Sequence, residues 1–330
     1  MTSVICLVWK ERDNVKKLIV FGGGTGLSCL LSGLKQFPVD VTTVITVSDD
    51  GSSTGVLKKE LDIPAVGDIG KVLISMANVD EDFVRLLRYR FSKDGSLYNH
   101  PVRNIMLAAL IDLKGSLSEA TNYMSKLLNV KGTVLPLTEE KVELVGKNGK
   151  QEYFGQVEVS RNVRNIRKLD YDHSVHISEA VIEKIGEADL IVFSPGSLYT
   201  SILPHLLSKE VLKALTEASA PILYVCNIVT QPGETDGYSV SDHLRVLNRY
   251  LKKRKVDIVL ANNTLPEADI AEHYLRTEGK EPVPIDREAL AEMNVRVIED
   301  SLLSMENGTI RHNALKTAFQ IFAFLMEQEE

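Results

Sequence analysis

The sequence predicts an α/β protein with a doubly wound, Rossmann-like and mostly parallel sheet, and three observations support this fold class. Short apolar runs recur along the chain, and each ends at a loop of small polar residues. A helical pattern follows most of these loops. One middle stretch alternates polar and apolar residues, which is typical of antiparallel strands. Because no long linker or internal repeat interrupts this rhythm, residues 1–330 are expected to form one integrated domain.

The composition excludes several classes of protein. Hydrophobic residues make up 44% of the 330 positions and charged residues 25%, which is enough to build a large core. The net charge of -7 opposes binding to nucleic acid or to an anionic membrane surface. Cys6, Cys29 and Cys226 are too widely spaced to predict a disulfide framework or a zinc site. Since no apolar run approaches ~18 residues and the run at residues 4–9 is too short for a signal peptide, we expect a cytoplasmic protein without membrane insertion.

The first two elements of the predicted sheet lie near the N-terminus. Residues 17–21 (KLIVF) form an apolar run that ends at a glycine turn, residues 22–26, and leucines then recur at helical spacing. A second β-branched run, residues 41–47, ends at the polar loop of residues 49–55. Two buried strands in succession predict parallel pairing.

The spacing of apolar residues changes twice in the middle of the chain. From residue 67 to about 124, apolar residues recur at helical spacing. Residues 132–171 then show alternating patterns and an Asn148-Gly149 pair, which favours a hairpin turn. We expect residues 132–171 to be a small antiparallel β insertion within the domain.

The strand-and-helix rhythm resumes after the insertion. Residues 190–193, 222–226 and 258–260 are further candidate parallel strands, and residues 295–298 are a last one. The chain closes with an amphipathic helix whose predicted apolar stripe consists of Leu315, Phe319, Phe322 and Met326.

The glycine turn is the first candidate ligand site. Gly23, Gly24, Thr25 and Gly26 remove bulky side chains where a strand turns into a helix, so backbone N–H groups can approach a phosphate or pyrophosphate. The turn departs from the usual dinucleotide fingerprint because Leu27 stands at the third glycine position. The alternative is a tight turn with no ligand.

The second candidate is the loop that begins with two carboxylates, Asp49 and Asp50, and continues with Gly51, Ser52 and Ser53. An acid at this place commonly binds ribose hydroxyls. Paired carboxylates also suit a hard divalent cation, and Asp50 is the candidate metal ligand. The alternative is that Asp49 only caps the following turn or helix.

Two later loops complete the predicted site. Gly196, Ser197 and Thr200 follow a buried strand and offer hydroxyls and backbone donors, although an N-cap with a Pro-Gly turn explains the same pattern. Asn227 and Thr230 begin a polar loop that is long for a strand-to-helix connection, which favours a functional role.

Other motifs are weaker. Residues 67–71 fail the Walker spacing, although Asp68 and Lys71 can still face the site. No G-x-S-x-G elbow surrounds Ser197, which disfavours a serine hydrolase. Arg311 precedes the last helix and either pairs with a phosphate or forms a salt bridge at the helix start.

Taken in order, these motifs resemble the YvcK-type gluconeogenesis factor family, a sister of the CofD 2-phospho-L-lactate transferases. They are residues 20–28 (VFGGGTGLS), 48–55 (SDDGSSTG), 67–71 (GDIGK), 194–201 (SPGSLYTS) and 227–242. The likeness runs from about residue 17 to the C-terminus, and residues 1–16 fall outside it. One departure is Arg103, in the segment His100-Pro101-Val102-Arg103-Asn104, where relatives often have glycine.

The resemblance implies a Rossmann-like core and a cytoplasmic bacterial protein that is needed for cell shape and wall integrity during gluconeogenic growth. It also implies binding of UDP-sugars such as UDP-N-acetylglucosamine. By the same resemblance, Tyr274 is expected to stack on the base or sugar and Arg311 to pair with phosphate. Arg103 stands where relatives often have glycine, and its side chain would crowd a close approach to the backbone. This argues against a ligand contact at the start of that helix.

Three functions are compatible with these features. The first is a non-catalytic, regulatory factor that binds a UDP-sugar and acts through cell-wall or metabolic protein partners. The second is a Mg²⁺-dependent phospholactyl or phospho-group transferase of the CofD type, with Asp49 and Asp50 at the matching motif. The third is an NAD-binding oxidoreductase, which the imperfect glycine fingerprint weakens. A homo-oligomer is a further expectation, and no nucleic-acid partner is expected.

Overall fold

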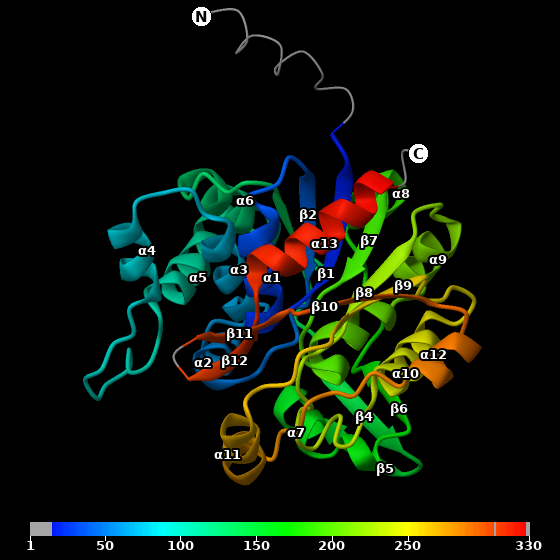
Figure 1. The fold of residues 1–330 in the computed structure, drawn as a ribbon. Coiled ribbons are helices and arrows are strands. Elements are labelled where there is room, and N and C mark those ends of the chain that lie inside the picture. The colour runs from blue at the N-terminus through cyan, green and yellow to red at the C-terminus, as the bar shows by residue number, and fades with distance from the viewer. Residues whose placement is uncertain (1–14, 307, 328–330) are drawn as a thin grey trace, which may run out of the picture.

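The computed structural model describes residues 15–306 and 308–327, and its main element is a seven-stranded parallel sheet (Figure 1). The strand order is β10-β9-β8-β7-β1-β2-β3. These strands are β1 (Lys17–Gly22), β2 (Asp40–Ile45), β3 (Thr133–Pro136), β7 (Leu190–Phe193), β8 (Ile222–Val225), β9 (Ile258–Asn262) and β10 (Arg296–Asp300). The predicted doubly wound, mostly parallel fold is therefore confirmed. The chain builds the sheet outward from β1 to β3 and then from β7 to β10, so the strand order reverses between β1 and β7.

Helices cover both faces of this sheet (Figure 1). The helices of the first half are α1 (Gly24–Leu34), α2 (Ser52–Glu60), α3 (Gly67–Met76), α4 (Glu81–Arg88), α5 (Val102–Lys114) and α6 (Leu117–Leu127). Those of the second half are α8 (Glu179–Glu187), α9 (Lys209–Glu217), α10 (Val240–Leu251), α11 (Ala268–Glu278), α12 (Arg287–Glu292) and α13 (Ala314–Glu327). A π-helical turn, η3 (Leu198–Ile202), and a 3₁₀ turn, η4 (Leu203–Leu206), follow β7 directly. The long helical stretch predicted from residue 67 onward is confirmed by α3 to α6.

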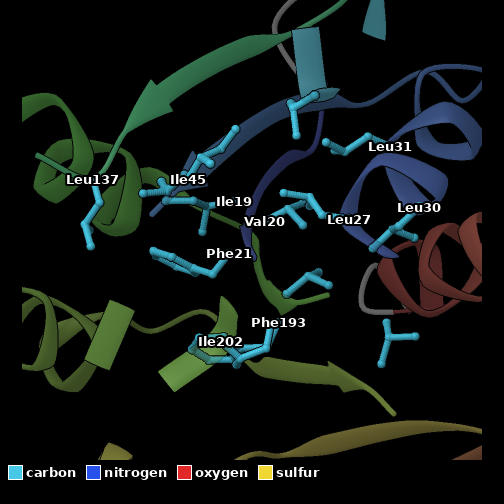
Figure 2. Packing of buried hydrophobic residues seen from close by; sticks show 14 of the residues in the cluster. Ile19, Val20, Phe21, Leu27, Leu30, Leu31, Ile45, Leu137, Phe193 and Ile202 are labelled. Atoms are coloured by element: carbon cyan, nitrogen blue, oxygen red, sulfur yellow. The ribbon is translucent and has the colours of Figure 1, made fainter. Parts of the chain in front are cut away.

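The core forms because the parallel strands are apolar on both faces. Five of the six residues of β1 are buried, and all four residues of β7 are buried. Figure 2 shows Val20 beside Leu27 of α1, while Phe21 points toward Phe193 and Ile202. The rings of Phe21 and Phe193 stack with their centroids 5.4 Å apart. This packing holds the ends of β1 and β7, and therefore the loops that follow them, in fixed positions.

The predicted antiparallel insertion exists, but its start at residue 132 is wrong. Residues 133–136 form β3, which pairs in parallel with β2 and is the edge of the main sheet. The insertion is a three-stranded sheet of order β5-β4-β6, made of β4 (Leu144–Asn148), β5 (Gln151–Phe154) and β6 (Lys168–Tyr171). It also contains α7 (Gln156–Arg161) and the 3₁₀ turn η2 (Val163–Asn165). The four residues of β3 are too short a run for the sequence pattern to separate from the alternating segment that follows.

The last helix buries a different face from the one predicted. Helix α13 packs on α1 through Ala318 and Ile321, and Gly33 lies so close that a Cβ there would be 2.9 Å from the Cβ of Ala318. Leu315 and Phe319 are instead 52% and 53% exposed. The apolar periodicity was ambiguous because α13 carries apolar residues on more than one face.

The expectations about membrane-spanning helices and about the cysteines can be compared with the described residues. Among the helices described here, none is long and apolar enough to cross a membrane. Cys29 and Cys226 are free thiols. Cys6 and the apolar run at residues 4–9 lie outside the described residues.

Candidate functional site

A cavity of about 500 Å³, the main cavity, opens where the strand order reverses. The loops after β1, β7 and β8 line it, together with a hairpin formed by β11 (Leu303–Glu306) and β12 (Thr309–His312). Its lining includes the predicted residues Gly23, Gly24, Thr25, Gly26, Gly196, Ser197, Asn227, Thr230 and Arg311. Predicted residues from three separate loops and one distant hairpin thus line one cavity.

The glycine turn exposes the N-terminus of α1 to the main cavity. Gly23 is the N-cap, makes no side-chain cap, and is followed by a first turn without an acidic residue. Gly24 has a φ of +68°, which favours glycine. At Gly26, a Cβ would lie 2.2 Å from the carbonyl oxygen of Pro195. The glycines thus allow both a bare helix N-terminus and its close contact with the loop after β7, an arrangement suited to binding an anion.

Arg311 faces the same cavity from β12. Its Nη1 donates to the carbonyl oxygen of Ile310 at 3.2 Å, and within residues 15–306 and 308–327 it forms no ion pair with a carboxylate. The salt bridge considered as the alternative for this arginine is therefore not found among those residues. A guanidinium with spare donors in a cavity is suited to pairing with a phosphate.

Tyr274 lies behind Arg311 rather than in the main cavity. Its side chain is 3% exposed, and its hydroxyl accepts a hydrogen bond from the backbone N–H of Ile310 at 2.5 Å. The ammonium group of Lys280, which lines the cavity, lies 5.9 Å from the centre of the Tyr274 ring. In this conformation the ring offers no open face for the predicted stacking, and its contacts instead hold the β12 backbone next to Arg311.

The loops after β7 and β8 are bonded to each other. The Asn227 side chain accepts from the N–H of Gly196 at 2.9 Å and donates to its carbonyl oxygen at 2.8 Å. The Thr230 hydroxyl accepts from the N–H of Glu281 at 3.0 Å. Thr200 is 3% exposed and shares a 2.6 Å hydrogen bond with Ser197. Many of the polar side chains predicted to bind a ligand therefore form hydrogen bonds within the protein that hold the wall of the cavity in place.

Glu234 organises this wall, and the sequence analysis did not single it out. The carboxylate is 2% exposed and accepts from the hydroxyls of Ser197 at 2.5 Å and Ser160 at 2.6 Å, and from the Gln231 amide at 2.9 Å. Burial raises the pKa of Glu234, and the hydrogen bonds oppose that shift. The only sequence signal was an acid in the long loop after β8, and Asp236 in the same loop carries that signal equally.

The loop of Asp49 lines a separate cavity of about 200 Å³, called here the Asp49 cavity. Asp49 accepts from the N–H of Gly51 at 3.0 Å, so it caps the turn as the alternative supposed. Ser53 bonds to the His100 ring at 2.8 Å, and Ser52 lies beside it in the cavity wall. The lining of the main cavity contains neither aspartate, and a single ligand that contacts both the glycine turn and these acids stays a prediction.

Asp68 lies between the two sites. A Cβ on Gly23 would lie 2.8 Å from an Asp68 carboxylate oxygen, and the other oxygen accepts from the Lys71 ammonium group at 2.8 Å. Burial raises the pKa of Asp49, and the negative charge of Asp68 adds to that rise. The acid that pairs with Asp49 is thus Asp68 rather than its sequence neighbour.

Asp50 instead contacts the antiparallel insertion. One carboxylate oxygen accepts from the N–H of Val157 at 3.1 Å, and the other would lie 2.2 Å from a Cβ on Gly155. This contact caps the start of α7. In the part of the chain that the structure describes, no group of three or more His, Cys, Asp or Glu side chains is placed to hold a metal ion. A metal-binding role for Asp50 stays a prediction.

Comparison with known proteins identifies the family. The family model for 2-phospho-L-lactate transferase CofD matches residues 18–303. A gluconeogenesis factor of Bacillus subtilis is 38% identical over 313 residues, which are 94% of this chain and 98% of that protein. The chain belongs to the CofD family, among its gluconeogenesis factors. A gluconeogenesis factor of Halalkalibacterium halodurans is also 38% identical, over 92% of this chain and 94% of that protein.

The fold of this CofD-family chain also matches a solved structure. A crystal structure of a Bacillus halodurans protein has a TM-score of 0.89 and 36% identity, and the match covers 94% of this chain and 100% of that one. The family resemblance inferred from the ordered motifs is therefore confirmed.

His312 is expected to make this CofD-family chain less stable in acid. Burial lowers the pKa of His312 to about 4 from 6.5, and its Nε2 lies 3.1 Å from the Cys226 carbonyl oxygen. Between these two pKa values the unfolded chain binds a proton that the folded chain does not. The free energy of unfolding should therefore fall as pH falls through this window, by on the order of 3 kcal/mol from this group.

Urea unfolding of the wild type and His312→Gln at several pH values measures this effect. The variant should lose less stability than the wild type between neutral pH and the folded pKa of the histidine. Equal losses for the two proteins would contradict the assignment.

Proposed function

We propose that the main cavity binds a UDP-sugar such as UDP-N-acetylglucosamine, and that the protein is a cytoplasmic, regulatory gluconeogenesis factor rather than an enzyme. In this proposal, ligand binding reports the supply of wall precursors and supports cell shape and wall integrity during gluconeogenic growth. The relatives named gluconeogenesis factors support the growth context.

The observation that carries the proposal is that one cavity is lined both by an uncapped helix N-terminus and by an arginine that has no carboxylate partner among the residues the structure describes. The amides at Gly24 and Thr25 and the guanidinium of Arg311 line it from opposite chain segments. A pyrophosphate carries negative charge on two linked phosphoryl groups, so it can contact both at once. The cavity volume of about 500 Å³ is within the usual range for ligand sites.

The remaining wall suits the sugar and base. Thr230, Gln231 and the backbone of Gly196 present polar atoms beside the apolar side chains of Ile228 and Val229. A few polar groups in a partly apolar wall are typical of a site that orients a small molecule.

Arg311→Ala is expected to weaken binding of UDP-N-acetylglucosamine about tenfold to a hundredfold, because the pyrophosphate loses a charge-assisted hydrogen bond. Isothermal titration calorimetry measures the affinity. Arg287→Ala is the matched control, since Arg287 pairs with Glu299 and lines neither cavity described above. The control should bind as the wild type does. No heat from the wild type at millimolar ligand would refute the proposal.

A transferase of the CofD type is the second candidate, and the pairing of Asp49 with Asp68 is the observation that favours it. Two neighbouring carboxylates suit Mg²⁺, which would offset the negative charge of a bound phosphate. Asp49 and Asp68 would hold the ion, and Lys71 would hold Asp68 in place.

Turnover assays separate the two candidates. A transferase should act on a nucleotide-linked substrate only with Mg²⁺, and Asp49→Asn should abolish that turnover. Loss of turnover in Asp50→Asn as well would make Asp50 a further ligand of the ion. If no nucleotide-linked substrate is turned over, the transferase candidate is excluded and the non-catalytic binding factor remains. Titration with NAD tests the oxidoreductase alternative, since NAD shares the pyrophosphate but not the uracil.

A further inference from the structure

A larger cavity of about 740 Å³, called here the basic cavity, lies next to the main cavity. It is bounded by α1, α3, α4, α5 and the β11–β12 hairpin. Five cationic side chains line it, against two acidic ones. The cations are Lys35, Lys71, Arg88, Arg103 and Arg311, and the acids are Glu81 and Glu306. The excess of positive charge indicates that the cavity is suited to an anion.

Arg103 is the unusual member of this set. It is only 7% exposed, yet within residues 15–306 and 308–327 it forms no hydrogen bond through its side chain and no ion pair. Its Nε is fully buried without an acceptor. Because removing a guanidinium from water without a partner is costly, a folded protein rarely keeps one that serves packing alone.

The surroundings hold the Arg103 guanidinium in place. Its aliphatic stem covers Gly70, where a Cβ would lie 3.1 Å from the Arg103 Cδ. Burial lowers the pKa of Arg103 to about 10, and the charges of Arg90 and Arg88 lower it further. Asp68 opposes this effect but already pairs with Lys71. The positive charge at Arg103 is therefore left without a dedicated counterion in the described residues.

A second cation in the basic cavity also lacks a carboxylate partner. Lys35 donates to the Ala77 carbonyl oxygen at 3.0 Å and forms no ion pair with another described residue. Burial lowers the pKa of Lys35, and the charges of Lys131 and Arg88 add to that effect. The Ala77 carbonyl oxygen and the negative charge of Glu81 therefore offset part of the charge of Lys35.

The N-terminus of α5 adds to the positive electrostatic potential near Arg103. Arg103 is the second residue of α5, whose N-cap, Pro101, makes no side-chain cap. The positive end of the helix dipole thus lies where the unpaired guanidinium begins. Asn104, the next residue, is 2% exposed, and its side-chain carbonyl oxygen also lacks a partner. Asn104 lines the Asp49 cavity, and Arg103 lines both this cavity and the basic cavity.

We propose that Arg103 binds a phosphate-sized oxyanion in the basic cavity, at a site separate from the N-terminus of α1. The oxyanion is either free or a group on the ligand of the main cavity. Both sources are open to this geometry because Thr25, Cys29 and Arg311 line the two cavities together. The proposal does not rest on UDP-sugar binding.

Calorimetric titration of the full chain with inorganic phosphate, at constant ionic strength, tests this site. The wild type should bind phosphate at millimolar concentration, and Arg103→Gln should bind at least about tenfold more weakly, because it loses charge-assisted hydrogen bonds. Arg85→Gln is the matched control, since Arg85 lies on the neighbouring helix α4, is 76% exposed and pairs with Asp82. It removes the same charge and should bind as the wild type does.

Thermal unfolding distinguishes an anion site from a structural arginine. Without phosphate, Arg103→Gln should unfold at a temperature equal to or above that of the wild type, because an unpaired buried charge is removed. Phosphate should raise the unfolding temperature of the wild type and leave that of the variant unchanged. Arg88→Gln provides a second variant, because Arg88 lines the same cavity and its charge acts on Arg103; it should also weaken phosphate binding.

Two results would overturn the proposal: no phosphate binding by the wild type, or equal binding by the wild type and Arg103→Gln. A repeat titration with saturating UDP-N-acetylglucosamine identifies the source of the oxyanion. Continued phosphate binding supports a free anion, and displacement that depends on Arg103 supports a group on the nucleotide ligand. If UDP-N-acetylglucosamine does not bind at all, only the proposed function fails, and the phosphate result still decides this site.

Discussion

Gly26→Ala is expected to destabilise the folded chain by about 2–3 kcal/mol and to abolish ligand binding in the main cavity. An added Cβ would lie 2.2 Å from the carbonyl oxygen of Pro195 and 3.3 Å from the backbone nitrogen of Gly196. Both are backbone atoms, so no side chain can rotate away to make room. Either α1 or the loop after β7 must move, and the two together form the proposed pyrophosphate site.

Gly186→Ala is the matched control for this substitution. Gly186 lies in α8, and a Cβ there would meet no atom within 4 Å. Alanine should stabilise that helix by about 0.5–1 kcal/mol and leave ligand binding unchanged. Urea unfolding followed by circular dichroism and calorimetry with UDP-N-acetylglucosamine measure both effects. A Gly26→Ala protein as stable as the wild type would show that the contact with Pro195 is not tight.

Glu234→Ala is expected to produce the second large effect, a loss of about 3 kcal/mol in the free energy of unfolding. The substitution leaves the hydroxyls of Ser197 and Ser160 and the amide of Gln231 without their buried acceptor. It also removes the hydrogen bonds by which Glu234 joins Ser160 of α7 to the loops after β7 and β8. Ligand affinity should fall with stability, because Ser197 lies in the wall of the main cavity.

Glu234→Gln separates the volume of this side chain from its hydrogen bonds. Glutamine fills the same space and keeps one acceptor oxygen, so it should cost roughly half as much as alanine. Chemical unfolding of both variants gives the comparison. If alanine and glutamine cost the same, the side chain contributes by packing and not by accepting three hydrogen bonds.

Most of the sheet could be predicted because buried parallel strands leave a strong local signal. The apolar runs at residues 17–21 and 190–193 each end at small polar residues, and each became a strand of the main sheet. Residues 133–136 were misassigned, since a four-residue edge strand carries too little pattern to reveal its partner. Pairing with β2 is a tertiary choice that the local sequence does not encode.

The sequence predicted which loops lie at the site, but not which partners their side chains contact. The sequence predicted a mostly parallel sheet but no strand order, and the glycine turn and Arg311 nevertheless line one cavity. The roles of Ser197 and Asp50 were harder to predict, because whether a polar side chain faces a ligand or a neighbouring loop depends on the fold. Ser197 bonds to Glu234, and Asp50 bonds to the insertion.

The surroundings of Arg103 could not be predicted from the sequence either. Its replacement of a family glycine argued against a ligand contact at that helix, because a large side chain would block the backbone. The structure places its stem over Gly70, and the guanidinium lies between two cavities without a partner among residues 15–306 and 308–327. A burial pattern of this kind depends on helices that pack together from separate parts of the chain, so the sequence alone could not predict it.

A crystal structure of the full chain soaked with UDP-N-acetylglucosamine is the most direct test of the proposed ligand site. The pyrophosphate oxygens are expected within about 3 Å of the Gly24 and Thr25 amides and of the Arg311 guanidinium. A nucleotide bound elsewhere on the protein, or a main cavity without nucleotide at a saturating concentration of ligand, would contradict the account.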